Sequence, residues 1–338
     1  MNRAIWLLLD SRDLGGIETH ILLVAKGLRQ VGYDPEILFW ADYGGHPLTA
    51  ELDAAELRWR MLGGRFGDLL AVLRARPALL HTHGYKAGIL GRVAARLCRL
   101  PVVSTFHSGE PGTGRLRAYF LLDRLTARLA PRIAVSAAIA ATLPAPVAVV
   151  PSFVELPPET ALGTGARNMI GFVGRMSPEK GPDLFGALAE QLADLPFAAY
   201  GDGPLRPALE ARYGDRIRFH GRVAPMAPHW PALALLVMPS RHEGLPLAAL
   251  EAMAYGVPVA AFAVGGLPTL IASGVDGLLA PPGDVAALVA AIRDWSGWPA
   301  ERRQAMAFAA RAKIARQYAL PAGIAALLPI YRAAGLRG

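Results

Sequence analysis

Short apolar runs alternate with amphipathic stretches along almost all of the 338 residues. The apolar runs lie at residues 5–9, 36–40, 79–83, 102–106, 133–135, 169–173, 197–200, 217–220, 235–238, 259–262 and 278–280. The amphipathic stretches lie at residues 17–30, 66–74, 87–97, 116–129, 182–192, 205–212, 246–255, 285–295 and 300–317. Strands that alternate with helices are typical of α/β proteins with parallel sheets, and this is the fold class we predict.

A proline-rich segment interrupts this alternation near the middle of the chain. Residues 144–167 include five prolines and two glycines, which cannot sustain a helix or a central strand and indicate a linker. At roughly 150 residues per domain, the length also predicts two domains. We expect Rossmann-like domains at 1–150 and 151–318, and a helix at 319–338 that crosses back to the first domain. The two sheets should face each other across a cleft, with ligands at the carboxyl ends of the strands.

Composition excludes several other classes of protein. A hydrophobic fraction of 53% and a charged fraction of 18% exclude a disordered chain. The single cysteine, Cys98, excludes a disulfide framework and a cysteine-based zinc site, and it fits a reducing cytosol. No run reaches 18 apolar residues, and the run from Ala4 ends before Asp10, too short for a signal peptide. We expect a protein that is soluble or attached to a membrane surface.

Positive charge is concentrated in one quarter of the chain. Residues 1–56 hold 4 basic and 9 acidic side chains, whereas residues 57–132 hold 14 basic and 3 acidic ones. Such a local positive field favours an anionic partner, either nucleic acid or anionic lipid. A solvated, arginine-rich surface without a partner is the alternative.

Two loops carry features suited to phosphate. Gly15 and Gly16 join the first strand to the first helix, where backbone amides approach an anion readily, although paired glycines also form ordinary tight turns. The G-x-G-x-x-G fingerprint of dinucleotide-binding folds is absent. After the strand at 169–173, Arg175 and Lys180 place two cations at a strand end, where they would meet a diphosphate well. A solvated loop is the alternative there.

Two glutamates flank the start of the helix expected at 246–255. Glu243 comes just before this helix, and Glu251 lies on its second turn. Eight helical residues span about 12 Å, similar to the distance between the sugar and the ribose of a nucleotide-sugar. Carboxylates accept hydrogen bonds from sugar hydroxyls. A helix start with an incidental glutamate is the alternative, but a glutamate in this apolar helix is costly without a partner.

Several histidines follow or end strands. His81 and His83 lie on one face of a strand, as a metal pair would. No cysteine or pair of carboxylates completes a ligand set nearby, so we expect no metal there. His107 ends the next strand, where a histidine is commonly a structural hydrogen-bonding group.

Taken together, these segments resemble retaining nucleotide-sugar glycosyltransferases of family four, which have the GT-B fold. The resemblance covers nearly the whole chain and is most specific in the E-x7-E pattern of Glu243 and Glu251. It also includes the segments 15–18, 149–155, 174–175, 180–181, 201–204 and 265–268. Three positions depart from the family pattern: Ser152 and Phe153 replace the usual Asn-Gly, and Thr269 replaces a common acid, so no acidic contact is expected at 269.

The resemblance implies a nucleoside-diphosphate sugar as donor, with UDP favoured over GDP, and transfer with retention of configuration. Glu243 would then hold the transferred sugar and Glu251 the ribose. Arg175 and Lys180 would neutralise the departing diphosphate, which is catalysis by electrostatic stabilisation of a leaving group. The resemblance, or a position at the start of a helix, implies further contacts with the donor. The residues that would make these contacts are Gly15, Gly16, Arg222, Val223, Gly244 and Leu245.

The acceptor side is implied for the N-terminal domain. His107 resembles the family's active-site histidine near the anomeric carbon, and His83, Tyr85 and Lys86 are expected to line the acceptor. No D-x-D sequence occurs, so no metal cofactor is expected to carry the diphosphate. The segment 115–125, which contains Arg117 and Arg124, is suited to an amphipathic helix that lies on anionic lipid. We therefore expect the protein at the cytoplasmic face of a membrane, with a lipid-linked or polysaccharide acceptor.

Two other readings stay open at this stage. A nucleotide-sugar epimerase or hydrolase could use the same fold, although no carboxylate is clearly placed for proton abstraction or water activation. A nucleic-acid-binding protein is suggested by the sequence pI of 9.9. Few aromatics accompany the basic segment, and helix-turn-helix and zinc patterns are absent, so we expect no nucleic-acid partner.

Overall fold

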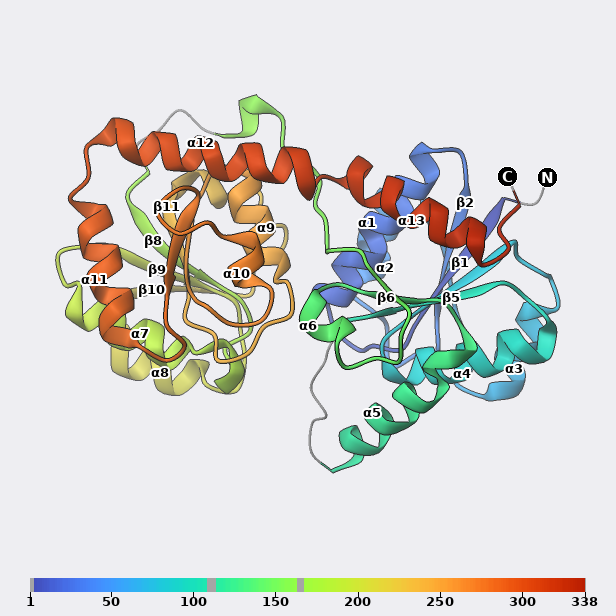
Figure 1. Ribbon diagram of the computed structural model, residues 1–338. Coiled ribbons are helices and arrows are strands. Elements are labelled where there is room, and N and C mark those ends of the chain that lie inside the picture. Colours follow the sequence, from blue (N-terminus) through green and yellow to red (C-terminus); the bar gives the residue numbers. More distant parts are fainter. Residues whose placement is uncertain (1–2, 108–113, 163–166, 338) are drawn as a thin grey trace. The chain divides into compact units, whose positions relative to one another are not determined.

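The computed structural model describes residues 3–107, 114–162 and 167–337, without the side chains of residues 115 and 116 (Figure 1). Contacts divide the chain into two compact units. The N-terminal unit comprises Met1–Phe153 and Leu320–Gly338, and the C-terminal unit comprises Val154–Ala319. Each unit is a parallel sheet with helices on both faces, so the predicted α/β class is confirmed.

The N-terminal unit contains a seven-stranded sheet in the order β3-β2-β1-β4-β5-β6-β7. Its strands are β1 (Ala4–Leu9), β2 (Asp34–Phe39), β3 (Arg58–Met61), β4 (Leu79–His83), β5 (Val102–Phe106), β6 (Arg132–Ala134) and β7 (Val147–Val149). Its α-helices are α1 (Gly16–Gln30), α2 (Leu48–Ala54), α3 (Phe66–Leu73), α4 (Tyr85–Cys98), α5 (Arg115–Thr126), α6 (Ala137–Ala140) and α13 (Leu320–Ala333).

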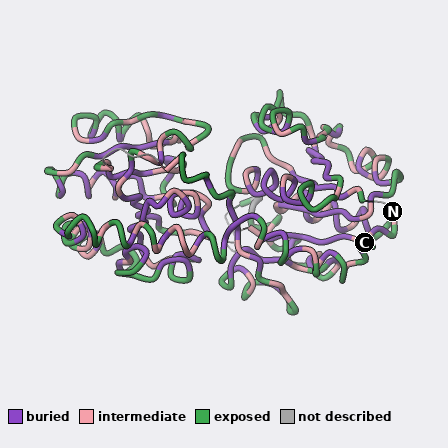
Figure 2. Tube along the Cα trace, turned by 90° about the horizontal axis from the view of Figure 1, so that it is seen from above, coloured by how far each residue is buried: buried purple, intermediate pink, exposed green. Residues whose placement is uncertain are grey.

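Both faces of this sheet are buried, which explains the continuous apolar runs of its strands. Along β1, Leu7 belongs to the core beneath α1 and α13, whereas Leu8 belongs to the core beneath α3 and α4. Helix α13 lies close against α1 because Gly27 has no side chain: a Cβ there would meet Ile324 at 2.4 Å. Figure 2 shows the buried residues along the inner segments of each unit.

The C-terminal unit contains a six-stranded sheet in the order β10-β9-β8-β11-β12-β13. Its strands are β8 (Met169–Val173), β9 (Phe197–Tyr200), β10 (Ile217–Gly221), β11 (Leu233–Met238), β12 (Val259–Phe262) and β13 (Gly277–Ala280). Its α-helices are α7 (Pro182–Gln191), α8 (Arg206–Tyr213), α9 (Leu247–Ala254), α10 (Leu267–Leu270), α11 (Val285–Ser296) and α12 (Ala300–Gln317). One core lies beneath α7, α8 and α11, and the other beneath α9, α10 and α12.

The order of the strands reverses once in each sheet. The reversal falls between β1 and β4 in the N-terminal unit and between β8 and β11 in the C-terminal unit. At such a switch point the loops leave neighbouring strands in opposite directions, so a crevice opens beyond their carboxyl ends. These two places are where the fold favours ligand binding.

The structure differs from the sequence expectation in the segment 144–167. Residues 147–149 form the edge strand β7, because only one side of an edge strand needs backbone donors and the flanking prolines are tolerated. The division between the units falls after Phe153, three residues beyond the expected 150. Phe153 is buried in the N-terminal core, where α13 approaches it at Gly323. The sequence also missed β3, an edge strand in which arginines alternate with apolar residues.

Candidate functional site

The two switch points collect most of the residues singled out in the sequence. In the C-terminal unit, β8 leads into Gly174 and Arg175, and β11 leads into the segment that contains Ser240 and Glu243. In the N-terminal unit, β1 leads to the loop that ends at Gly15, and β4 ends at His83. Each unit therefore carries one group of candidate residues.

Glu243 is the centre of the group in the C-terminal unit. Its side chain is 3% exposed, and Lys180 Nζ lies 2.8 and 2.9 Å from its two oxygens. The Ser240 hydroxyl donates a further hydrogen bond of 2.8 Å to the same carboxylate. These contacts give the Glu243 side chain an ionic partner and a hydrogen bond, without which burying a carboxylate would be costly.

A close approach of two loops creates this ion pair. Gly181 has a φ of 66°, and a Cβ at this position would lie 2.1 Å from the carbonyl oxygen of Pro239. Only glycine allows this contact. The contact brings the residue before it, Lys180, to the end of β11, where Ser240 and Glu243 lie.

A second ion pair fastens the same loops from outside. Arg241 contacts both carboxylate oxygens of Asp183, at 2.9 and 2.6 Å, and also donates to the carbonyl of Pro178. The hydrogen bonds from Arg241 lower the pKa of Asp183 despite its partial burial. The backbone amide of Arg241 donates to the carbonyl of Glu179 at 2.8 Å. Sequence reasoning did not assign roles to Arg241 or Ser240, although both lie in the segment that it singled out.

The remaining predicted donor residues lie on neighbouring loops of the C-terminal unit. Arg175 is exposed, and its loop is held to the next strand end by a hydrogen bond from the Met176 amide to Asp202. Arg222 is exposed just after β10. The Gly266 amide donates a hydrogen bond of 2.6 Å to the Gly244 carbonyl.

Three further predicted donor residues are at least partly buried. Val223 is partly buried, Leu245 is buried, and Glu251 is partly buried on the second turn of α9. Since α9 begins at Leu247, the interval between the two glutamates is only partly helical, and the expected 12 Å of continuous helix is wrong.

In the N-terminal unit, Gly15 and Gly16 form the start of α1, as expected. Glu18, in the first turn, is 5% exposed. Burial raises the pKa of Glu18, against hydrogen bonds from its own amide, Ser11 and Gly15. The amide of Gly15 is thus already engaged by a carboxylate, which leaves less capacity for a phosphate at this helix end than the glycines alone suggested.

The predicted acceptor-side residues lie on β4 and α4. Lys86 forms an ion pair with Asp10 at 3.3 Å and lies over the ring of Trp40. Burial opposes the charge of Lys86, but Asp10 and Tyr43 together raise its pKa. Tyr85 makes an edge contact with the Phe120 ring of α5.

The histidines on β4 and β5 have separate hydrogen-bond partners. His81 does not act with His83 as a pair, because its two ring nitrogens bond to Tyr331 and Thr105, each at 2.7 Å. His83 instead bonds to His107 at 3.2 Å, and His20 of α1 lies beside both. Sequence reasoning missed His20, because a histidine inside an amphipathic helix gives no signal of what it faces.

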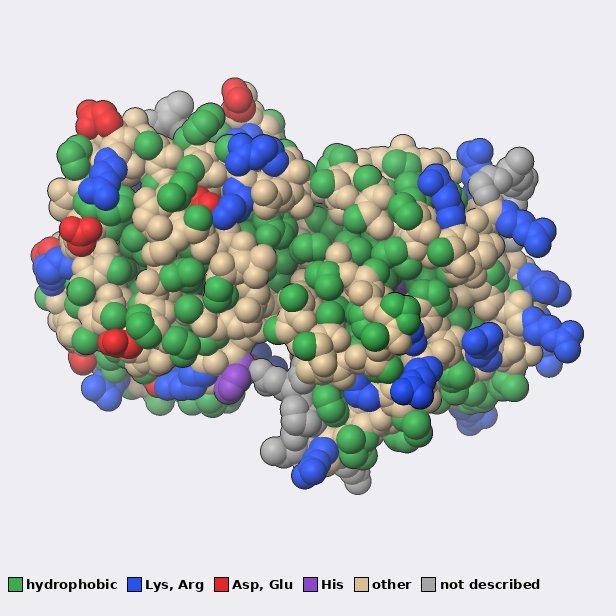
Figure 3. Space-filling view, in the orientation of Figure 1, with side chains coloured by type: hydrophobic (Ala, Val, Ile, Leu, Met, Phe, Trp, Pro, Cys, Tyr) green, Lys and Arg blue, Asp and Glu red, His purple; other side chains and the backbone are tan. Residues whose placement is uncertain are grey.

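The basic segment is only partly a charged surface. Figure 3 shows Lys and Arg side chains over the N-terminal unit. Arg92, however, is 1% exposed and forms a buried ion pair with Asp123 that joins α4 to α5. Arg124 also contacts Asp123 and stacks over Phe120, so its guanidinium is engaged within the protein and is less available to anionic lipid than the sequence suggested.

Helix α5 exposes an apolar surface. Tyr119, Leu121, Leu122 and Leu125 are exposed, with Leu125 at 74%. Exposed arginines lie on the same helix at Arg117 and just after it at Arg128. Among the helices that the structure describes, none is long and apolar enough to cross a membrane.

Comparison with known proteins agrees with this architecture. Residues 14–156 match the family described as Glycosyltransferase Family 4, and residues 167–296 match the one described as Glycosyl transferases group 1. The chain is 32% identical to the 2-deoxystreptamine N-acetyl-D-glucosaminyltransferase of Streptomyces fradiae, over 83% of this chain and 82% of that protein. It is 29% identical to the D-inositol 3-phosphate glycosyltransferase of Thermomonospora curvata, over 95% and 91% of the two chains.

Solved structures share the fold at low sequence identity. Anabaena HepE in complex with UDP has a TM-score of 0.84 at 19% identity, covering 98% of this chain and all of that one. The complex of the same protein with UDP-glucose gives a TM-score of 0.83 at 20% identity, covering 98% of each chain. Fold and relatives define a glycosyltransferase with the GT-B fold. The chain belongs to glycosyltransferase family 4, and the enzyme reading of the sequence is confirmed.

Proposed function

We propose that this enzyme transfers a sugar from a UDP-sugar to a hydroxyl group with retention of configuration, and that the C-terminal unit binds the donor. The observation that carries the proposal is the group of Lys180, Ser240 and Glu243 at the β8/β11 switch point, with Arg175 exposed beside it. Two cations and a hydrogen-bonded carboxylate suit a diphosphate joined to a sugar. The complexes of Anabaena HepE with UDP and UDP-glucose support UDP as the nucleotide.

The proposed roles follow from the chemistry of each group. Arg175 and Lys180 stabilise the negative charge that develops on the leaving diphosphate, and Glu243 accepts hydrogen bonds from the transferred sugar. Glu251 binds the ribose, and Arg222 and Val223 lie near the base. Amides at Gly16, Gly244 and Leu245 add hydrogen-bond donors. His107 contacts the reacting sugar, and His83, Tyr85 and Lys86 bind the acceptor.

Donor binding is tested by thermal shift, because a ligand that binds only the folded protein raises the melting temperature. UDP-glucose and UDP-N-acetylglucosamine are compared with GDP- and ADP-sugars. UDP-sugars should stabilise most, and Arg175→Met should weaken their binding by about 10–150-fold, the equivalent of a charged hydrogen bond. Arg302→Met, which removes an exposed arginine outside the site, is the control. A larger shift with GDP-sugars would overturn the choice of nucleotide.

We further propose that transfer needs no divalent metal, because Arg175 and Lys180 supply positive charge to the diphosphate. Activity in excess chelator should stay near its untreated value. A loss of activity that magnesium restores would contradict this proposal.

For the acceptor, we propose a lipid-linked or glycan hydroxyl that the enzyme meets at an anionic membrane surface on the cytoplasmic side. The exposed leucines of α5, flanked by Arg117 and Arg128, support this choice, because apolar insertion and attraction to anionic lipid act together. A soluble cyclitol is the second candidate, since the named relatives act on 2-deoxystreptamine and inositol phosphate. Transfer to inositol phosphate or 2-deoxystreptamine in the absence of lipid would favour the second candidate.

A further inference from the structure

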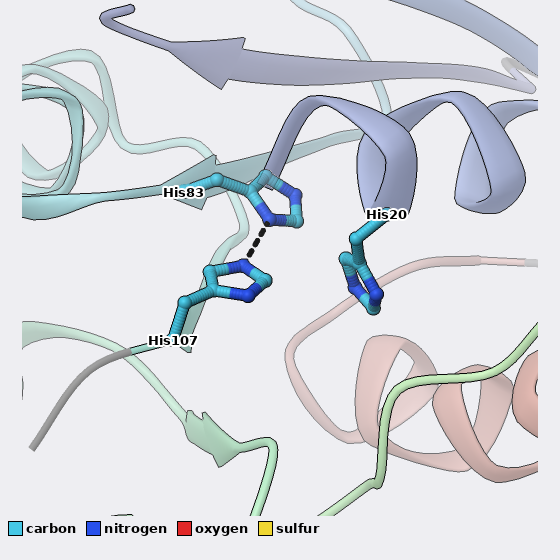
Figure 4. A group of neighbouring side chains, drawn as sticks. All are labelled: His20, His83 and His107. Atoms are coloured by element: carbon cyan, nitrogen blue, oxygen red, sulfur yellow. Dashed lines mark hydrogen bonds between the residues drawn. The ribbon is translucent and has the colours of Figure 1, made fainter. Parts of the chain in front are cut away.

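Three histidines from separate elements meet inside the N-terminal unit (Figure 4). His20 comes from α1, His83 ends β4, and His107 follows β5 directly. One ring nitrogen of each lies within 4.8 Å of the others, and His83 Nδ1 is 3.2 Å from His107 Nε2. The three rings therefore point toward one small volume.

Apart from the bond between His83 and His107, hydrogen bonds among the described residues do not account for this cluster. His20 is 2% exposed and His83 is 1% exposed. Neither nitrogen of His20, nor Nε2 of His83, has a hydrogen-bond partner among the described residues. His81, the nearest histidine in the sequence, has partners for both of its nitrogens. Leaving a buried polar atom without a partner costs about 1–3 kcal/mol, so a role besides packing is indicated.

All three rings are in the form that binds metals. Burial lowers the pKa of His20 to about 4. Burial, together with the neighbouring histidines, lowers the pKa of His83 and of His107 well below the usual value. The imidazoles are therefore neutral at physiological pH, and each offers one lone pair. The proton shared in the hydrogen bond between His83 and His107 must move to the other nitrogen of its ring before both rings can bind one ion, so binding requires a change of tautomer but no net loss of protons.

The spacing fits a tetrahedral transition-metal ion. Zinc–nitrogen bonds of about 2.0 Å place two ligand nitrogens roughly 3.3 Å apart. The nitrogens of His83 and His107 are already 3.2 Å apart, and a nitrogen of His20 lies within 4.8 Å of both. Three histidines with a fourth position left for a small molecule is a known arrangement for zinc.

We propose that His20, His83 and His107 form a binding site for Zn²⁺, and that the bound ion inhibits sugar transfer. The inhibition rests on the proposed function, in which His107 and His83 contact substrates, whereas the binding of the ion does not. An ion bound to the nitrogens of these two histidines prevents them from contacting the substrates. The three histidines belong to the N-terminal unit, whereas Arg175 and Lys180 belong to the C-terminal unit, so the proposed ion is not the group that neutralises the diphosphate.

Binding is tested on the untagged full-length chain with Zn²⁺ by calorimetry, and with Co²⁺ by its visible absorption, which reports the coordination geometry. We expect one ion per chain and a four-coordinate cobalt spectrum. His20→Leu should weaken binding by more than the 10–100-fold typical of losing an outer-shell partner. This substitution removes no hydrogen bond, so the variant should fold. His242→Ala, which removes an exposed histidine elsewhere, should bind as the unaltered chain does. No stoichiometric binding, or equal binding by His20→Leu, would overturn the site.

The inhibitory role is tested separately by sugar transfer at increasing Zn²⁺ concentration. Activity should fall as the calorimetric site fills and return when chelator is added. His20→Leu should keep its activity in chelator and lose most of its sensitivity to Zn²⁺. Binding without inhibition would refute the inhibitory role and the proposed part of His107, while leaving the metal site. Inhibition that is unchanged in His20→Leu would show that the ion acts elsewhere and refute the proposal.

Discussion

Lys180 Nζ lies within hydrogen-bond distance of both carboxylate oxygens of Glu243, at 2.8 and 2.9 Å. The cation proposed for the diphosphate and the carboxylate proposed for the sugar are thus one ion pair. A diphosphate that binds Lys180 must share it with Glu243. Ser240 donates to Glu243 as well, so the carboxylate keeps one partner when the lysine turns to the diphosphate.

The first prediction concerns Glu243. Glu243→Ala removes a group whose contacts tighten as the glycosidic bond breaks, so kcat should fall on the order of 100-fold or more. The affinity for UDP should not fall, because Lys180 is released from its carboxylate partner and attracts the diphosphate more strongly. Steady-state kinetics and calorimetry with UDP measure the two effects. Weaker UDP binding in this variant would show that the carboxylate supports the nucleotide.

The second prediction concerns Glu251. If Glu251 holds the ribose, it contributes equally to the ground and transition states. Glu251→Ala should then raise the donor KM and weaken UDP binding by about 10–150-fold, with a smaller change in kcat. Because Glu251 lies on α9, which packs on the core, circular dichroism must first show that the variant is folded. The paired comparison is decisive: UDP binding that weakens in Glu243→Ala but not in Glu251→Ala would reverse the two assignments.

Much of this architecture could be predicted because the strands are buried on both faces. The runs at 5–9 and 169–173, for example, lie within β1 and β8. The edge strand β3 was missed, since an edge tolerates alternating arginines. In the candidate site, Arg175 and Lys180 were found from the loop that follows a strand, and Glu243 from its place before a helix and its spacing to Glu251. His20 was not, because its neighbours come from β4 and β5, and contacts between distant segments leave no local pattern.

The third prediction concerns the buried ion pair that attaches α5. Arg92 lies 2.7 Å from Asp123 and also donates to the hydroxyls of Ser104 and Thr126. Arg92→Met leaves the Asp123 carboxylate buried with Arg124 as its remaining ionic partner. Breaking such a pair lowers the free energy of unfolding by ~3–5 kcal/mol. Because Arg124 still contacts Asp123, we expect a loss at the lower end of this range, about 3 kcal/mol.

Urea denaturation measures the loss of stability, and hydrogen exchange locates it. In Arg92→Met, the amides of α5 should exchange faster than they do in the unaltered chain. The amides of the C-terminal unit should keep their exchange rates. Arg96→Met is the matched control on the same helix, because Arg96 is exposed and makes one hydrogen bond to the carbonyl of Leu129. Arg96→Met should change the free energy of unfolding by no more than about 0.5 kcal/mol. Equal losses in both variants would mean that the ion pair does not anchor α5.

The last prediction tests the membrane surface proposed for α5. Protein should float with vesicles of phosphatidylcholine that contain phosphatidylglycerol, and it should detach as salt rises, because screening weakens attraction to the lipid. Arg117→Glu with Arg128→Glu should abolish flotation while leaving UDP affinity unchanged. The control pair, Arg212→Glu with Arg316→Glu, changes the net charge equally at exposed positions of the C-terminal unit and should still float.

Leu125→Ser separates apolar insertion from electrostatic attraction. It leaves the charge unchanged and removes a side chain that is 74% exposed on α5. If the leucine enters the lipid, the binding constant for anionic vesicles should fall by about 10–150-fold, as expected for losing the burial of one side chain worth ~1.5–3 kcal/mol. Should Leu125→Ser bind as tightly as the unaltered chain, α5 would be held by charge alone. Should the two charge-reversal pairs behave alike, the positive field of the whole chain, and not this helix, would be what the lipid attracts.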